Sequence, residues 1–195
     1  MSLYTPRHFE GERAAALRLI DAHPFATLIT TLDGAEALVS HLPLLRQGEA
    51  LHGHMARANP HWRAFAAGRT LAVFHGPHAY VSPRWYEEPA QHVPTWNYAS
   101  VHVAGRPQTL DDAGAQATLA TLTAHFDPAF RATDENVARL LPAIVAFRLP
   151  IERLEAKFKM SQNRSAGDRA GVAAALAAQA SADARAVAEW MRRHG

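Results

Sequence analysis

The chain contains no cysteine among its 195 residues. That absence excludes disulfide bonds, cysteine nucleophiles, iron–sulfur clusters and zinc sites built from cysteine. No run of about 18 apolar residues is present, and the first twenty residues lack the apolar segment and cleavage site of a signal peptide. We therefore expect a soluble, cytoplasmic protein with no membrane partner.

The chain also lacks an excess of charge of either sign. Lys and Arg number 20 against 18 Asp and Glu, which gives a formal net charge of +2. Such a balance is not typical of a histone-like DNA-binding protein. Hydrophobic residues make up 48% of the chain and charged residues 19%, so the composition predicts a globular protein. We expect a single domain over residues 1–195.

Several catalytic motifs are missing: GxSxG, the Walker phosphate loop, GxGxxG after a strand, and HExxH. Serine hydrolases, nucleoside triphosphatases, Rossmann dehydrogenases and zincins are disfavoured accordingly. The 12 histidines are the one compositional feature that points towards a metal or heme. His52 and His54 are spaced to lie on one face of a strand, but no third ligand is near them in sequence, and we predict no metal site.

Hydrophobic periodicity predicts a chain dominated by strands, with helices mainly in its second half. Asp33-Gly34 predicts a hairpin turn, Gly76-Pro77 a break between strands, and Pro150 an interruption or a bulge. Strands are expected at 25–31, 36–45, 50–55, 70–75, 79–82, 96–103 and 144–158, and helices at 12–21, 59–68, 109–124, 134–141 and about 166–194.

This arrangement predicts a mainly β fold with α additions, because six or seven strands follow one another with few helices between the early ones. An antiparallel barrel with peripheral helices satisfies that order. The alanine-rich C-terminal segment, at about 166–194, is expected to be one helix that is either closely packed or exposed.

Three segments carry polar or aromatic residues suited to binding. Arg57 and Asn59 precede Pro60, where a fixed charge and a helix start suit a phosphate, or form an ordinary surface cap. Residues 93–98 (VPTWNY) suit either a wall for a flat heterocycle or a strand start packed on the core. Residues 157–164 (KFKMSQNR) are either a solvated loop or a source of anion-binding donors.

Seven blocks of sequence, in order along nearly the whole chain, resemble the PaiB family of FMN-binding negative transcriptional regulators. The blocks are residues 4–9 (YTPRHF), 24–28 (PFATL), 40–43 (SHLP), 53–60 (GHMARANP), 74–83 (FHGPHAYVSP) with Trp85 and Tyr86, 93–98 (VPTWNY) and 157–164 (KFKMSQNR).

The resemblance implies an FMN-binding split barrel that forms a homodimer, with FMN in the groove between subunits. By the same resemblance, the phosphate cradle includes Ala56 and Arg57, with Asn59 starting the helix behind it. Pyridoxamine-phosphate oxidases carry Ser, Arg and Lys around this turn, whereas this chain has Ala-Arg-Ala at 56–58, so the phosphate geometry departs from that pattern.

The resemblance also implies further cofactor contacts. Residues of the second and third strands face the flavin, the 93–98 block meets the isoalloxazine edge from the same or the partner subunit, and the 157–164 block has a binding role. The predicted contacts are Ser40, His41, His54, Thr95, Trp96, Asn97, Lys159, Gln162 and Asn163.

The resemblance to the PaiB family implies a dimeric FMN-binding protein whose flavin, or its redox state, is sensed to regulate expression. A flavin-dependent oxidoreductase using NAD(P)H is the alternative, and a split-barrel heme protein with a histidine ligand is a third. The helices predicted at 109–124 and 134–141 carry few basic residues and form no helix-turn-helix pair, so the sequence does not predict direct DNA binding.

Overall fold

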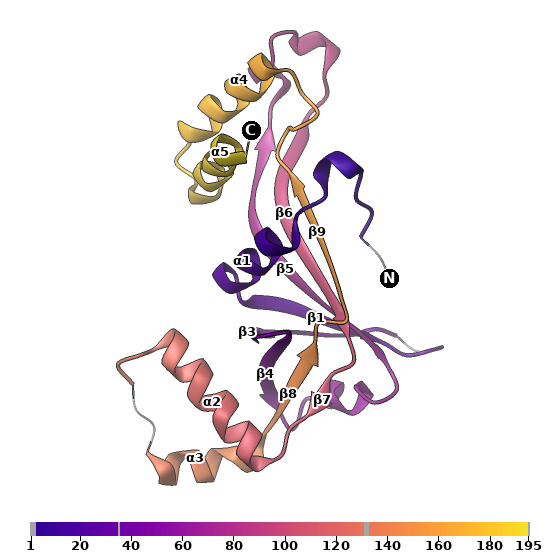
Figure 1. The fold of residues 1–195 in the computed structure, drawn as a ribbon, viewed down its shortest axis with the longest axis vertical. Helices are drawn as coiled ribbons and strands as arrows, with labels where there is room; N and C mark the ends of the chain where they lie inside the picture. Colours follow the sequence, from indigo (N-terminus) through magenta and orange to yellow (C-terminus); the bar gives the residue numbers. More distant parts are fainter. Residues whose placement is uncertain (1–2, 35, 131–132, 195) are drawn as a thin grey trace. The chain divides into compact units, whose positions relative to one another are not determined.

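The fold is described from a computed structural model, for residues 3–34, 36–130 and 133–194 (Figure 1). The strands are β1 (Phe25–Thr31), β2 (Leu38–Pro43), β3 (Leu45–Gln47), β4 (Ala50–Ala56), β5 (Arg69–Val81), β6 (Thr95–Gly105), β7 (Gln108–Thr109), β8 (Ile144–Pro150) and β9 (Arg153–Lys159). The α-helices are α1 (Arg13–Ala22), α2 (Asp112–Phe126), α3 (Asp134–Leu140), α4 (Ala166–Ala177) and α5 (Ala182–His194). Short 3-10 helices are η1 (Arg7–Phe9), η2 (Pro60–Ala64), η3 (Pro83–Trp85), η4 (Pro89–Gln91) and η5 (Leu141–Ala143).

The strands form two sheets, which confirms the predicted mainly β fold with α additions. The larger sheet has the order β2-β1-β5-β6-β9, and the smaller has the order β3-β4-β8-β7. The pairs β1–β2, β1–β5, β3–β4, β4–β8 and β7–β8 are all antiparallel.

The chain divides into two compact units. The terminal unit contains the residues up to Ala16, His75–Val101, and the residues from Glu155 onward, and the central unit contains Leu17–Phe74 and His102–Leu154. The single domain over 1–195 stays a prediction.

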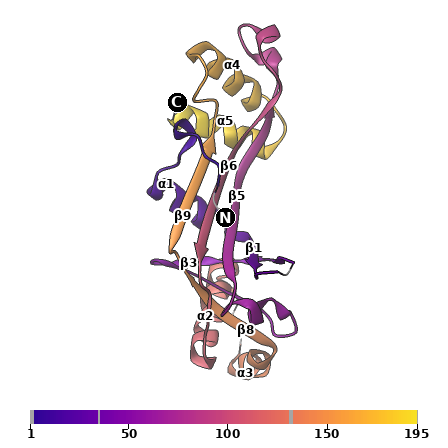
Figure 2. The same ribbon diagram turned by 90° about the vertical axis from the view of Figure 1, so that its right-hand side faces the viewer.

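In the terminal unit, β5, β6 and β9 lie side by side (Figure 2). Alternate residues of β6 and β9 are buried, as expected for strands with one covered face. The ring of Phe158 on β9 lies 4.7 Å from that of Trp190 on α5, and α5 also contributes the buried Val187. One face of this part of the sheet is therefore packed under α5.

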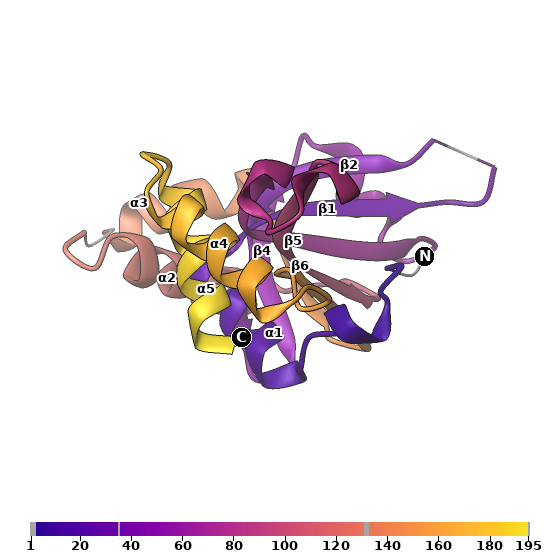
Figure 3. The ribbon, with the colours of Figure 1, turned by 90° about the horizontal axis from the view of Figure 1, so that it is seen from above.

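In the central unit, β1 and β2 pair from Phe25–Pro43 to Thr30–Leu38 (Figure 3). β4 pairs with all seven residues of β8. The core is made of fully buried apolar side chains, among them Leu28, Leu51, Phe147 and Leu149. Asp111 caps α2 by accepting a hydrogen bond from the backbone N–H of Gly114.

Two predicted helices differ from the structure. The helix expected at 59–68 is the five-residue 3-10 helix η2. The alanine-rich segment at about 166–194 forms two helices, α4 and α5, and not one. The hydroxyl of Ser181 accepts a hydrogen bond from Ala184 N–H at the start of α5, and Arg185 donates to the carbonyls of Gln179 and Ala180. These bonds satisfy backbone groups where one helix ends and the next begins.

The interruption expected at Pro150 is confirmed, and it separates β8 from β9, which belong to different sheets. Two strand predictions were wrong. The segment 36–45 divides into β2 and β3. The expected break at Gly76-Pro77 is absent, and β5 runs through it. The pairing of β1 with β5 ends at Ala26–Phe74, so Pro77 does not have to donate a hydrogen bond to β1.

Among the residues described, no helix combines the length and the apolar character needed to cross a bilayer.

Candidate functional site

An exposed group of aromatic rings lies on the terminal unit. Trp96 on β6 is 52% exposed and Tyr80 on β5 is 44% exposed. The Tyr80 ring meets the Trp96 ring edge-on, with 6.1 Å between the ring centres. The ring of His78, two residues before Tyr80 on β5, lies 6.2 Å from the Trp96 ring. We call His78, Tyr80 and Trp96 the aromatic face. The face follows from strand alternation, because Ala79 and Asn97, which point the other way, are buried.

Lys159, the last residue of β9, is hydrogen-bonded to the start of β6, beside the aromatic face. Its Nζ donates hydrogen bonds to Thr95 Oγ1 and, at 2.7 Å, to the carbonyl of Trp96. Burial lowers the pKa of Lys159 below its ordinary 10.5, and the nearby charges of Lys157 and Arg164 lower it further. Among the residues described, these bonds use two of the three ammonium hydrogens, and the third is available to a ligand.

A second lysine, Lys157, lies two residues before Lys159 on β9 and is held against two tyrosine rings. Its Nζ donates to the carbonyl of Tyr4 at 3.0 Å and lies 5.6 Å from the ring centre of Tyr98 and 5.4 Å from that of Tyr4. The exposed side of this sheet is therefore both aromatic and basic.

The predicted binding segments 93–98 and 157–164 are each other's hydrogen-bond partners. Asn97 is buried, and its Nδ2 donates to Ser161 Oγ at 3.0 Å. Ser161 has a φ of +65°, a backbone conformation rare for residues other than glycine. Gln162 closes the turn, because its side chain accepts from Met160 N–H and donates to the carbonyl of Phe158. Asn163 is exposed.

The central unit holds a chain of hydrogen bonds that ends inside the core. Asn59 Nδ2 donates to Ser40 Oγ at 3.0 Å, and Ser40 Oγ lies 2.8 Å from Nδ1 of His61. His61 Nε2 lies 2.8 Å from Thr30 Oγ1, which lies 2.8 Å from Thr70 Oγ1. The orientation that satisfies each group has Ser40 donating to His61 and His61 donating to Thr30.

His61, Thr30 and Thr70 are the members of this hydrogen-bonded chain that sequence reasoning missed. His61 is 1% exposed, and burial lowers its pKa below the ordinary 6.5. The imidazole is therefore held neutral, as its acceptor role at Nδ1 requires. Its only sequence signal is its place two residues after Asn59, whose Oδ1 accepts from His61 N–H.

The structure does not bring His41 and His54 to Ser40. Ser40 and His41 are consecutive on β2, so their side chains point to opposite faces, and His41 Nδ1 lies 3.1 Å from Thr27 Oγ1. His54 on β4 has a pKa lowered by burial, and its Nδ1 is buried with no hydrogen-bond partner among the described residues.

Arg57, the predicted phosphate ligand, is exposed, and part of its guanidinium is hydrogen-bonded to the backbone of the same chain. Its Nε donates to the carbonyl of Pro142 at 2.7 Å and its Nη2 to that of Ile144 at 2.8 Å. These bonds fix the guanidinium plane and leave Nη1 for another acceptor. Ala56, the preceding residue, is exposed at the end of β4.

A metal site is not formed by the part of the chain that the structure describes, where no three His, Asp or Glu side chains gather as ligands.

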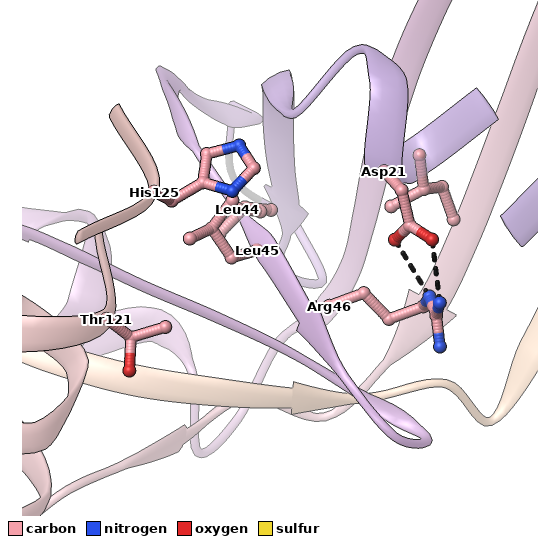
Figure 4. Close-up of a pocket in the computed structure, with 7 residues that line it drawn as sticks. Asp21, Leu44, Leu45, Arg46, Thr121 and His125 are labelled. Atoms are coloured by element: carbon pink, nitrogen blue, oxygen red, sulfur yellow. Dashed lines mark hydrogen bonds and ion pairs between the residues drawn. The ribbon is translucent and has the colours of Figure 1, made fainter. Parts of the chain in front are cut away.

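A pocket of about 300 Å³ in the central unit is lined by Ile20, Leu44, Leu45, Thr121 and His125, with the Asp21–Arg46 pair at its rim (Figure 4). Arg46 donates to both oxygens of Asp21, so this pair is already satisfied. None of the residues predicted from sequence lines this pocket.

The family described as "Putative FMN-binding domain" matches residues 3–153. The protease synthase and sporulation protein PAI 2 of Bacillus subtilis is 33% identical over 202 residues, covering 97% of this chain and 96% of that protein.

Two solved structures share the fold. The flavocytochrome Anf3 from Azotobacter vinelandii matches with a TM-score of 0.66 at 18% identity, over 80% of this chain and 72% of that one. The FAD and heme binding protein from Mycobacterium smegmatis matches with a TM-score of 0.63 at 20% identity, over 82% and 77%. The likeness concerns the fold alone, and it confirms the predicted antiparallel split barrel.

Proposed function

The chain belongs to the family of FMN-binding domains that matches its residues 3–153, and from that premise we propose that the protein binds FMN. The observation that carries the proposal is the aromatic face. Isoalloxazine is a flat, three-ring heterocycle, and exposed indole and phenol rings are suited to stacking against it. Trp96, with Tyr80 and His78 beside it, offers such a surface.

Lys159 suits a flavin, whose ring system gains negative charge when it is reduced. FMN, when bound, supplies one-electron and two-electron redox chemistry. A cation next to the ring stabilises negative charge on it, and Lys159 Nζ is already fixed by Thr95 and Trp96. We therefore assign Lys159 the role of holding positive charge next to the ring system.

For the phosphate the family resemblance suggests Arg57 of the central unit, with the aromatic face that meets the ring belonging to the same or the partner subunit; the Arg57 guanidinium is exposed and oriented by two backbone carbonyls. Riboflavin provides the test, since it has the same ring system without the phosphate. Arg57→Ala should weaken FMN binding about tenfold or more, the size expected for a charge-assisted contact, and leave riboflavin binding unchanged. Equal loss for both ligands would move the phosphate site elsewhere.

We further propose that the protein acts as a homodimer and influences expression through its flavin, without direct DNA contact. The resemblance to the PaiB family suggests the regulatory role. A net charge of +2 and the absence of Lys and Arg from α2 support the lack of DNA contact. Size-exclusion chromatography at dimer mass, and no gel shift at about physiological salt, are the expected results.

The visible absorption spectrum of the purified protein tests FMN binding, recorded before and after denaturation and after adding FMN. The spectrum of oxidised flavin should be present, or appear on addition, and denaturation should release it as free FMN. A colourless protein that takes up no added FMN would contradict the proposal.

A further inference from the structure

The segment that joins β5 to β6, residues 82–94, is held against the start of α4. We call it the 82–94 loop. Asp168, in the first turn of α4, is 6% exposed, and its Oδ1 accepts a hydrogen bond of 2.9 Å from Glu87 N–H. Ser165, which caps α4 by accepting from Asp168 N–H, donates its hydroxyl to Glu87 Oε2 at 3.1 Å. The loop backbone is thus bound to a buried carboxylate.

Arg164 holds the second half of the 82–94 loop. Its Nη1 lies 3.0 Å from His92 Nδ1, and its Cζ lies 5.0 Å from the ring centre of Tyr86. The Tyr86 and His92 rings meet edge-on at 4.7 Å. Because Arg164 can only donate, His92 accepts at Nδ1 and carries its proton on Nε2, which faces Asp168 Oδ2 at 3.8 Å.

Close backbone contact keeps the loop in this place. A Cβ atom added at Gly171 would lie 2.3 Å from the carbonyl oxygen of Trp85. α4 therefore approaches the 82–94 loop so closely that only glycine, which has no Cβ atom, fits at position 171. Tyr86 is 5% exposed, so the loop is packed and not merely tethered.

The same C-terminal segment that holds the loop also holds Trp96. His92 is four residues before Trp96, and Lys159 fixes Thr95 and the Trp96 carbonyl. Arg164 and Asp168 follow Lys159 in sequence. The 82–96 segment is therefore held at one end by Lys159 and over the rest by Arg164 and Asp168.

We propose that Asp168 and Arg164 are positioning residues for Trp96, acting through the 82–94 loop. This inference rests on the proposed function, in which Trp96 stacks on the flavin ring. The side-chain contacts of both residues described above are with the 82–94 loop. Each acts by restricting the loop that leads into β6, so that the indole keeps the orientation a flat ring requires.

The test compares Asp168→Ala, Asp168→Asn and Arg164→Ala with Arg169→Ala, an arginine on α4 outside these contacts. The readouts are hydrogen exchange of peptides covering 84–94, without FMN, and the fluorine NMR signal of Trp96 in protein labelled with fluorotryptophan. Loss of a hydrogen bond to a charged group should speed exchange in the loop about tenfold in the Ala variants. The Trp96 signal should shift or broaden in them and stay unchanged in Arg169→Ala.

FMN affinity is measured in the same proteins. We expect about a tenfold loss in Asp168→Ala and a smaller one in Asp168→Asn, which keeps the acceptor for Glu87 N–H. Unchanged loop exchange and an unchanged Trp96 signal in both Arg164→Ala and Asp168→Asn would overturn the inference, even if Asp168→Ala fails to fold. A faster loop with an unaltered Trp96 signal would also overturn it. If the wild-type protein binds no FMN, the proposed function fails, while exchange and NMR still decide whether these residues position Trp96.

Discussion

At the scale of residues, the central unit depends on one buried imidazole. His61 connects Ser40, near the surface, to Thr30 and Thr70 in the core. The sequence identified Ser40 and Asn59 through the family resemblance, but not His61 or the threonines. The reason is physical: the chain of hydrogen bonds joins segments far apart in sequence, and no local pattern records that pairing.

Removing the Thr30 hydroxyl tests this chain. Thr30→Val leaves His61 Nε2 and Thr70 Oγ1 without their partner in a buried position, and should lower the free energy of unfolding by about 1–3 kcal/mol. Thr31→Val is the control, since that hydroxyl has only a 3.5 Å contact with the Arg69 carbonyl, and should cost less than about 0.5 kcal/mol. Urea denaturation gives both values, and equal effects would contradict the account.

The pH dependence of stability follows from the same imidazole. Burial lowers the pKa of His61 in the folded state below the 6.5 of the unfolded chain. Between these two values the unfolded state binds more protons, so stability is complete above about pH 6.5 and falls as the pH decreases, by at most about 1.4 kcal/mol per pH unit. His61→Gln should make the loss between pH 7.5 and 5.5 smaller in urea denaturation. An identical loss in both proteins would show that His61 does not contribute.

At the scale of elements, hydrophobic periodicity predicted most strands and helices and failed where tertiary contacts decide. Pro77 lies inside β5 because β1 ends beside Phe74, which no local signal shows. The interruption at Pro150 was predicted, but no local signal shows that the strands on its two sides, β8 and β9, join different sheets. The alanine-rich segment reads as one helix, because alanine favours helix throughout and the Ser181 cap with the Arg185 contacts is a weak signal against it.

The contact between α4 and the 82–94 loop gives a prediction for two glycines. Gly171→Ala should lower the free energy of unfolding by about 1–3 kcal/mol, because the new Cβ meets the backbone carbonyl of Trp85 at 2.3 Å. Gly167→Ala should cost less, since its Cβ meets only the carboxyl end of Glu87, which can rotate away. Thermal or urea unfolding compares the two. A Gly171→Ala protein as stable as the wild type would contradict this close approach.

At the scale of the whole molecule, the sequence predicted the fold class, and the comparisons confirm it. Two of the predicted binding segments, 93–98 and 157–164, are hydrogen-bonded to each other, a pairing between distant segments that no local sequence pattern shows. Tyr80 and His78, the exposed ring partners of Trp96, were missed. They lie on β5, which the sequence analysis divided into two strands at Gly76-Pro77.

The central claim is that the flavin ring binds the aromatic face. The most direct test is the FMN dissociation constant of Trp96→Ala, from quenching of flavin fluorescence, beside Phe126→Ala, which removes an aromatic ring of 53% exposure from α2. Loss of a stacking partner worth about 1–1.5 kcal/mol should weaken FMN binding about tenfold in Trp96→Ala and leave Phe126→Ala unchanged. Equal affinities in Trp96→Ala and the wild type would contradict the claim.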